Sequence, residues 1–169
     1  MSYIINLGKY DKFEILSKYI LDFVYKNKDI FYKINQLALQ YYDYPSLDCA
    51  NGHEKTKHEN KFINLIPCFE KTPVEEFFDN IGYKLCRTRV FLAKPNKIAY
   101  SVHKDIYKRL HLPIITNDYC FFTFFDPNEK KYPAMQSDGS YYEVNTLVDH
   151  TFTNKGNIDR IHIVGSILE

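Results

Sequence analysis

"RLHLPIITNDYCFFTFF", residues 109–125, contains two short runs, RLHLPII and YCFFTFF, separated by the turn-forming TND. Within these runs, side chains of different character alternate along the chain. An alternation with a period of two is typical of β-strands, because successive side chains point to opposite faces. Similar runs recur from residue 84 onward, separated by turn-forming stretches such as KPNK, DPNEKKYP and NKGN; they cover 85–93, 97–103, 141–148 and 160–168. The second half of the chain is therefore predicted to consist of short antiparallel strands.

The first 83 residues have helical periodicity instead. Apolar residues at helical spacing predict an amphipathic helix over 11–27, and a second helix is predicted over 30–41. A short helix is predicted over 72–82, because Thr72 is a good N-cap, Pro73 follows it and Glu75 completes a capping box.

The order of these segments predicts the fold class. Helices followed by a run of strands indicate an α+β, mainly β protein, an antiparallel sandwich or jelly-roll braced by N-terminal helices. The polar stretch PSLDCANGHEKTKHENK, residues 45–61, is predicted to be a long loop between the helices. At 169 residues we expect a single domain, with a helical part at 1–83 and a β core at 84–169.

Composition narrows the class of function. The net charge of +1 offers no electrostatic footprint for nucleic acid, and no apolar stretch approaches the length of a membrane span. The four cysteines form no C-x-x-C motif, and the N-terminal stretch lacks the apolar region of a signal peptide. We therefore expect reduced thiols and a cytoplasmic protein.

Two of the predicted strands carry an Arg-x-His pair on one face. Arg109 and His111 alternate with leucines in RLHLPII, and Arg160 and His162 alternate with isoleucines in RIHIV. Two interpretations are open at this stage. These faces are either solvated, as the polar face of a sheet usually is, or they line a functional site.

The metal-ligand residues favour the second interpretation. His103 and Asp105 are two residues apart at a strand end and can therefore share a face, and His150 supplies a third ligand from downstream. Two histidines and one carboxylate form the facial triad of non-haem Fe(II) oxygenases. Arg160 follows His150 by ten residues and can clamp the distal carboxylate of a dicarboxylate cosubstrate. The stretch HEKTKH at 53–58 is not a zinc-protease motif, because its histidines are five residues apart instead of four.

These motifs, in this order, resemble the aspartyl/asparaginyl β-hydroxylase family of 2-oxoglutarate-dependent oxygenases. The resemblance runs from about Arg87 to Val164: a strand ending in His-x-Asp, the Arg-Leu-His-Leu-Pro strand, then His-x-x-x-Asn-x-Gly and Arg-Ile-His. It implies a cupin-like double-stranded β-helix. It implies Fe(II) at His103, Asp105 and His150, and 2-oxoglutarate at Arg160, Arg109 and His111. His162, Tyr142 and Asn145 are candidate residues lining the site.

The implied activity is a dioxygenase that uses Fe(II), 2-oxoglutarate and O2 to hydroxylate an unactivated C–H bond. The substrate would be an amino acid, a peptide or protein side chain, or a small metabolite. Nucleic acid is not expected, because the second arginine of the nucleic-acid dealkylases would fall at Ser166. A non-catalytic, cupin-like binding module is the alternative. The 45–61 segment carries no family motif. We hypothesise that it overhangs the site as a substrate-binding flap.

Overall fold

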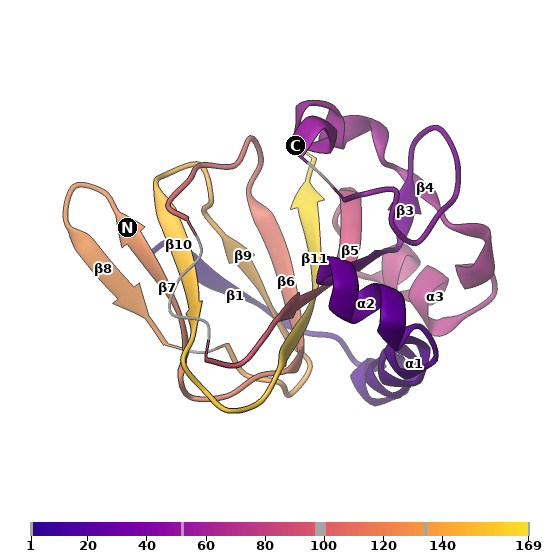
Figure 1. The fold of residues 1–169 in the computed structure, drawn as a ribbon, viewed down its shortest axis with the longest axis horizontal. Coiled ribbons are helices and arrows are strands. Elements are labelled where there is room, and N and C mark those ends of the chain that lie inside the picture. The colour runs from indigo at the N-terminus through magenta and orange to yellow at the C-terminus, as the bar shows by residue number, and fades with distance from the viewer. Residues whose placement is uncertain (1, 52, 97–100, 134, 169) are drawn as a thin grey trace.

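The computed structural model describes residues 2–51, 53–96, 101–133 and 135–168. The helices α1, α2 and α3 lie in the first half of the chain, together with two 3-10 helices, η1 and η2, and four of the strands (Figure 1). In chain order the elements are β1 (Ile4–Lys9), α1 (Phe13–Lys26), α2 (Lys28–Ile34), β2 (Gln36–Ala38), β3 (Gln40–Tyr41), η1 (His53–Lys61), β4 (Asn64–Leu65), η2 (Pro67–Phe69), α3 (Pro73–Asn80), β5 (Leu85–Ala93), β6 (Arg109–Ile115), β7 (Cys120–Phe125), β8 (Glu129–Tyr132), β9 (Ser140–Val144), β10 (His150–Asn154) and β11 (Arg160–Ile167).

Two antiparallel sheets form the body of the protein. The larger has the strand order β1-β9-β6-β11-β5-β2, and the smaller has the order β10-β7-β8. An isolated bridge between His103 and His150 adds the segment after β5 to the β10 edge of the smaller sheet. Figure 1 shows the smaller sheet on the left and the larger sheet beside it. The protein is mainly β, as predicted.

From β5 onward, the chain passes back and forth between the two sheets. The chain passes from β5 in the larger sheet to His103 in the smaller, and returns through β6. It then crosses to β7 and β8, back to β9, across to β10 and finally to β11. Side chains from both sheets meet in one cluster that includes Phe122, Phe124 and Phe152 from the smaller sheet and Ala93 and Val144 from the larger. The inner faces of the two sheets therefore enclose a shared interior.

The central strands β6 and β11 of the larger sheet are buried on both faces. On β6 and β11, Leu110, Leu112, Ile161 and Ile163 belong to the core that the helices cover. The alternate residues on these strands point into the space between the sheets, and they are almost fully buried; Arg109, His111, Arg160 and His162 are between 1% and 5% exposed. The interpretation that both Arg-x-His faces are solvated is therefore wrong, because the second sheet covers them.

The N-terminal helices cover the outer face of the larger sheet. The buried residues of α1 recur at helical spacing and pack in the same core as the leucines of β6; they are Phe13, Leu16, Ile20 and Val24. The predicted helix over 11–27 is confirmed as α1. The short helix predicted over 72–82 is confirmed as α3, where the Thr72 hydroxyl accepts a hydrogen bond from the Val74 amide. Glu75 accepts from the Lys71 amide, at 2.6 Å, and so braces the residue before the N-cap.

The helix predicted over 30–41 is wrong beyond Ile34. Asn35 adopts the left-handed conformation with φ 61°, which ends α2. Gln36–Ala38 then pair with β5 as strand β2, so a tertiary contact overrides the helical pattern. The 45–61 segment, predicted to be a loop, contains the 3-10 helix η1.

Within residues 2–51, 53–96, 101–133 and 135–168, six strands are present that the alternation pattern did not identify. β8 lies inside DPNEKKYP, which was predicted to be a turn, and pairs with β7. β10 pairs with β7 although its residues, HTFTN, form no apolar face. β1, β2, β3 and β4 are short or at sheet edges. The run predicted over 97–103 falls mostly outside the described residues.

The cysteines agree with the prediction of reduced thiols. All four are free; Cys68 is exposed, and Cys49, Cys86 and Cys120 are buried. No helix in the described part of the chain is long and apolar enough to cross a bilayer.

Candidate metal centre

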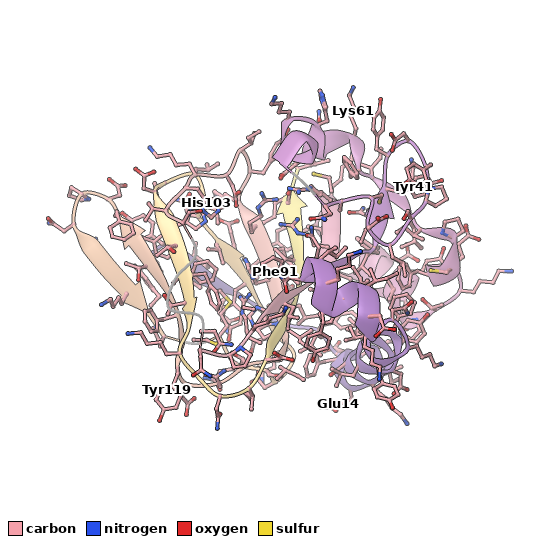
Figure 2. All side chains as sticks on the ribbon, in the orientation of Figure 1. Glu14, Tyr41, Lys61, Phe91, His103 and Tyr119 are labelled. Carbon is pink, nitrogen blue, oxygen red and sulfur yellow. The ribbon has the colours of Figure 1, made fainter. Side chains whose placement is uncertain are left out.

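The three predicted metal ligands lie together at one end of the space between the sheets. His103 and His150 exchange backbone hydrogen bonds of 3.1 and 3.0 Å, which places their rings 4.5 Å apart between centroids. The Asp105 amide donates to the Thr146 carbonyl at 2.8 Å, which holds Asp105 beside them. Figure 2 shows His103 toward the same edge of the molecule as Lys61, with Tyr119 at the opposite edge.

Backbone carbonyls select the tautomer of both histidines. His103 Nδ1 lies 2.8 Å from the Ser101 carbonyl, and His150 Nδ1 lies 2.9 Å from the Val148 carbonyl. A carbonyl oxygen only accepts, so each Nδ1 carries the hydrogen, and in the neutral ring Nε2 is the atom with the lone pair. This is the outer hydrogen bond that metal-ligating histidines usually make.

The charge state of the site also suits a cation. Burial lowers the pKa of His150, so this ring is neutral at pH 7. Burial alone would raise the pKa of Asp105, but the hydrogen bond and charge of Arg109 outweigh it and lower the pKa to about 2. A neutral imidazole at His150 and an ionised carboxylate at Asp105 are therefore available together, beside the ring of His103.

The donor set fits a single ion. One ligand atom from each of His103, Asp105 and His150 lies within 4.8 Å of the others, and His103 Nε2 is 3.9 Å from Asp105 Oδ1. Ligands at about 2.0–2.2 Å from an ion lie no more than about 4.4 Å apart, so small side-chain rotations close the set around one ion. Three ligands do not fill the coordination shell of an octahedral ion, so further positions would be left for small molecules.

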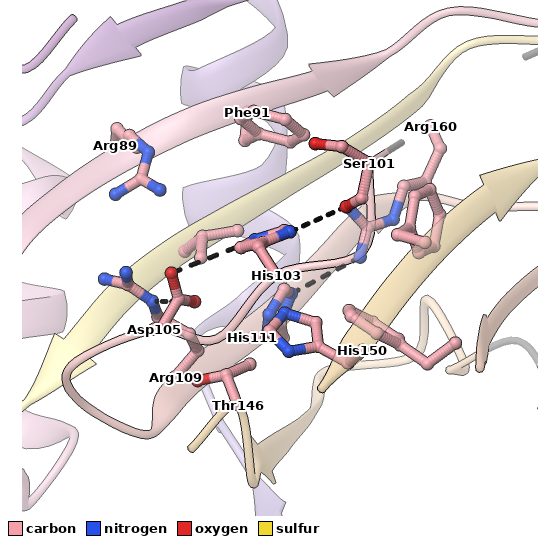
Figure 3. A pocket seen from close by; sticks show the side chains of 13 residues that line it. Arg89, Phe91, Ser101, His103, Asp105, Arg109, His111, Thr146, His150 and Arg160 are labelled. Carbon is pink, nitrogen blue, oxygen red and sulfur yellow. Dashed lines mark hydrogen bonds and ion pairs between the residues drawn. The ribbon is translucent and has the colours of Figure 1, made fainter. Parts of the chain in front are cut away.

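The three ligands open into a pocket of about 160 Å³. Its wall contains three arginines, one from each of β5, β6 and β11, and aromatic residues from both sheets (Figure 3). The lining residues are Arg89, Phe91, Ser101, His103, Asp105, Arg109, His111, Phe122, Thr146, His150, Phe152, Arg160 and Val164. Cationic and apolar groups therefore surround a candidate metal site.

Arg160 and His111, which come from different strands, meet in the pocket. Arg160 Nη2 lies 3.3 Å from His111 Nδ1, and the guanidinium stacks 4.1 Å above the Phe152 ring. Burial, followed by the charges of Arg160 and Arg109, lowers the pKa of His111 well below its ordinary value. A neutral His111 accepts from Arg160 and directs the guanidinium. Cosubstrate binding by either residue stays a prediction.

All three guanidinium nitrogens of Arg109 donate hydrogen bonds to protein groups. Its Nε donates to Asp105 Oδ2 at 2.8 Å, and Nη1 and Nη2 donate to Glu59 at 2.8 and 3.0 Å. Nη1 also donates to the Ser166 hydroxyl. In this structure Arg109 therefore orients a metal-ligand carboxylate, and its predicted contact with a cosubstrate stays untested.

The sequence interpretation missed Glu59. This carboxylate is 1% exposed and lies in η1, inside the stretch assigned to a polar loop. It accepts hydrogen bonds from Arg87 at 2.6 Å, from Arg109 and from Ser166 at 2.7 Å. No periodicity marks Glu59 among the charged residues of 45–61. The end of the candidate flap is thus tied to the strands that form the site.

The remaining predicted lining residues lie outside the main pocket. His162 is buried beneath it, in a small cavity shared with Cys120, Phe152 and Arg160. The Tyr142 hydroxyl accepts a hydrogen bond from the Gln136 amide, and the Asn145 side chain accepts from the Leu147 amide. Neither Tyr142 nor Asn145 is among the described residues that line the pocket.

No family model and no curated protein matches the chain. The resemblance to the β-hydroxylase family therefore rests on the motif residues themselves. Among solved structures, one that is similar is a cupin domain from Bordetella pertussis Tohama I. It is 12% identical, with a TM-score of 0.41, over 53% of this chain and 88% of that chain.

Proposed function

We propose that this protein is an Fe(II)- and 2-oxoglutarate-dependent dioxygenase that hydroxylates an unactivated C–H bond. The observation that carries the proposal is the set of two histidine ring nitrogens and one carboxylate oxygen within 4.8 Å of one another, in the lining of a pocket that also contains three arginines. A two-histidine, one-carboxylate set with open positions is the arrangement typical of non-haem Fe(II) oxygenases.

We further propose that the two sheets form a double-stranded β-helix of the jelly-roll, cupin-like type. The support is the passage of the chain from sheet to sheet between β5 and β11, with all pairings in both sheets antiparallel. A jelly-roll consists of two Greek-key motifs whose antiparallel strands form two sheets. In this arrangement His103 and His150 belong to neighbouring strands, which accounts for their closeness despite their separation in sequence.

The pocket fits 2-oxoglutarate in charge and chemistry. This cosubstrate chelates a metal through its 2-oxo acid end and carries a carboxylate at its far end. Arg160 is buried in the pocket wall, held by His111 and stacked on Phe152. A guanidinium fixed in this way presents a planar pair of donors to the distal carboxylate.

Bound Fe(II), 2-oxoglutarate and O2 would supply oxidative decarboxylation to succinate and carbon dioxide, with one oxygen atom entering a C–H bond of the substrate. The chain's own residues bind and orient. Arg109 keeps Asp105 ionised and aimed at the metal position. Phe122 and Phe152 give the pocket an apolar wall, which limits water near the reacting groups.

The first test is an anaerobic titration of the protein with Fe(II) and then 2-oxoglutarate, followed by the weak visible charge-transfer band of the ternary complex. We expect the band in the wild type and in His58→Ala, an exposed histidine outside the site, and its loss in His103→Ala. Succinate formation with a substrate panel then tests turnover. Iron binding without the band would favour the non-catalytic, cupin-like binding module instead.

A further inference from the structure

Arg89 has no counter-ion in the described part of the protein. It lies on β5 and its side chain lines the pocket. Nη1 donates to the Arg87 carbonyl at 3.0 Å, and Nε is buried without a hydrogen-bond partner. The nearby carboxylates are taken by other arginines, because Glu59 pairs with Arg87 and Arg109, and Asp105 pairs with Arg109.

The charges around Arg89 leave one positive charge uncompensated. Three guanidiniums, those of Arg87, Arg89 and Arg109, stand against the two carboxylates of Glu59 and Asp105. Burial, followed by the charges of Arg87 and Arg109, lowers the pKa of Arg89 to about 9, so it is still protonated at pH 7. Arg89 is half-buried, and its buried Nε is a donor without an acceptor, which is costly unless an anion nearby offsets the charge.

The position of Arg89 separates it from the proposed cosubstrate clamp. Figure 3 shows Arg89 and Arg160 on opposite sides of His103, with Asp105 on the Arg89 side. Arg89 pairs in register with Val164, four residues beyond Arg160 on β11. A cosubstrate held by Arg160 and the metal would therefore leave Arg89 facing the remaining part of the pocket, where the substrate has to lie.

We infer that Arg89 is the anchor for a carboxylate on the substrate, so that the enzyme acts on a carboxylic acid, either an amino acid or an acidic side chain of a peptide. That the bound carboxylate belongs to a substrate rests on the proposed function. The anion-binding site itself rests only on Arg89 and its surroundings. A guanidinium can bind a carboxylate through two parallel N–H···O hydrogen bonds. The pocket volume of about 160 Å³ suits a small acid.

The experiment compares Arg89→Gln and Arg89→Lys with Lys94→Gln, an exposed cation near the end of the same strand. Each protein is loaded with Mn(II) and 2-oxoglutarate, so that nothing turns over, and binding of a panel is followed by ligand-observed NMR. The panel contains free amino acids, their carboxamides, and capped peptides with Asp or Glu side chains. Binding of free acids alone indicates an amino-acid substrate, and binding of the capped acidic peptides indicates a peptide substrate.

We expect the carboxylates to bind the wild type and Lys94→Gln, and their amides to bind poorly. Arg89→Gln should lose roughly 10- to 100-fold in affinity for the acids, with partial recovery in Arg89→Lys. Affinity for 2-oxoglutarate in the Fe(II) complex should stay within about threefold, since Arg160 is untouched. Matching thermal melts establish that the variants are folded.

Three outcomes would overturn the inference. Equal binding of acids and amides by the wild type would show that no carboxylate is recognised. Unchanged acid affinity in Arg89→Gln would place the anchor elsewhere. A loss confined to 2-oxoglutarate would make Arg89 part of the cosubstrate site. If the wild type forms no charge-transfer band, yet Arg89-dependent binding of acids persists without 2-oxoglutarate, the anion site stands and the proposed dioxygenase function fails.

Discussion

Replacement of Glu59 by Gln is the sharpest test of how the site is held. The side chain is 1% exposed and accepts hydrogen bonds from Arg87, Arg109 and Ser166. Burial alone would raise its pKa, but Arg109, Ser166 and Arg87 outweigh burial and lower the pKa, so Glu59 is ionised at pH 7. Gln keeps the size and one acceptor oxygen and removes the charge.

The expected loss in the free energy of unfolding follows from the arginines that lose an ion-pair partner. In Glu59→Gln, Arg87 loses its carboxylate partner and Arg109 keeps only Asp105. Removing one partner of a buried ion pair typically costs about 3–5 kcal/mol. The free energy of unfolding of a domain is only about 5–15 kcal/mol, so the variant should be much less stable at pH 7.

Urea denaturation monitored by circular dichroism measures this loss, with Glu14→Gln as the control, because Glu14 is an exposed acid on α1. The control should change stability by no more than about 0.5 kcal/mol. The difference between wild type and Glu59→Gln should shrink as the pH falls below 4.5, because the lowered pKa of Glu59 stabilises the folded state only while the carboxylate is ionised. A loss below about 1 kcal/mol at pH 7 would refute the reasoning.

Three further predictions concern the site. Arg160→Ala should weaken 2-oxoglutarate binding by roughly 10²–10³-fold and leave iron binding intact, measured from the charge-transfer band. His150→Ala should abolish Fe(II) binding, whereas Asp105→Asn, which keeps an oxygen ligand, should retain part of it in anaerobic calorimetry. Burial, followed by the charge of Arg160, lowers the pKa of His111 and His162 below the ordinary value of 6.5. Below that pH the unfolded chain takes up protons that the folded protein does not. The free energy of unfolding should therefore fall by up to about 1.4 kcal/mol per pH unit for each ring. Urea titrations from pH 7 to 5 measure this fall, and His162→Asn should remove the contribution of one ring.

Local patterns in the sequence were enough for the main strands of the body. Residues 85–93 and 109–115 are strands with the predicted bounds, because their alternation is long and their apolar faces are clear. The same reasoning failed at β10, whose polar residues form no apolar face, and at Gln36–Ala38, where pairing with β5 decides the conformation. Strand pairing is a long-range interaction, and no window of sequence contains it.

The sequence by itself determined the chemistry available to the site: the metal-ligand types at 103, 105 and 150, and arginines alternating with apolar residues on strands. Only the tertiary structure decided how that chemistry is used. It buried the Arg-x-His faces between two sheets, joined Glu59 to Arg109 and Arg109 to Asp105, and left Arg89 without a counter-ion among the described residues. The reason is that charge pairing and desolvation depend on distances between residues far apart in the chain, which the fold alone sets.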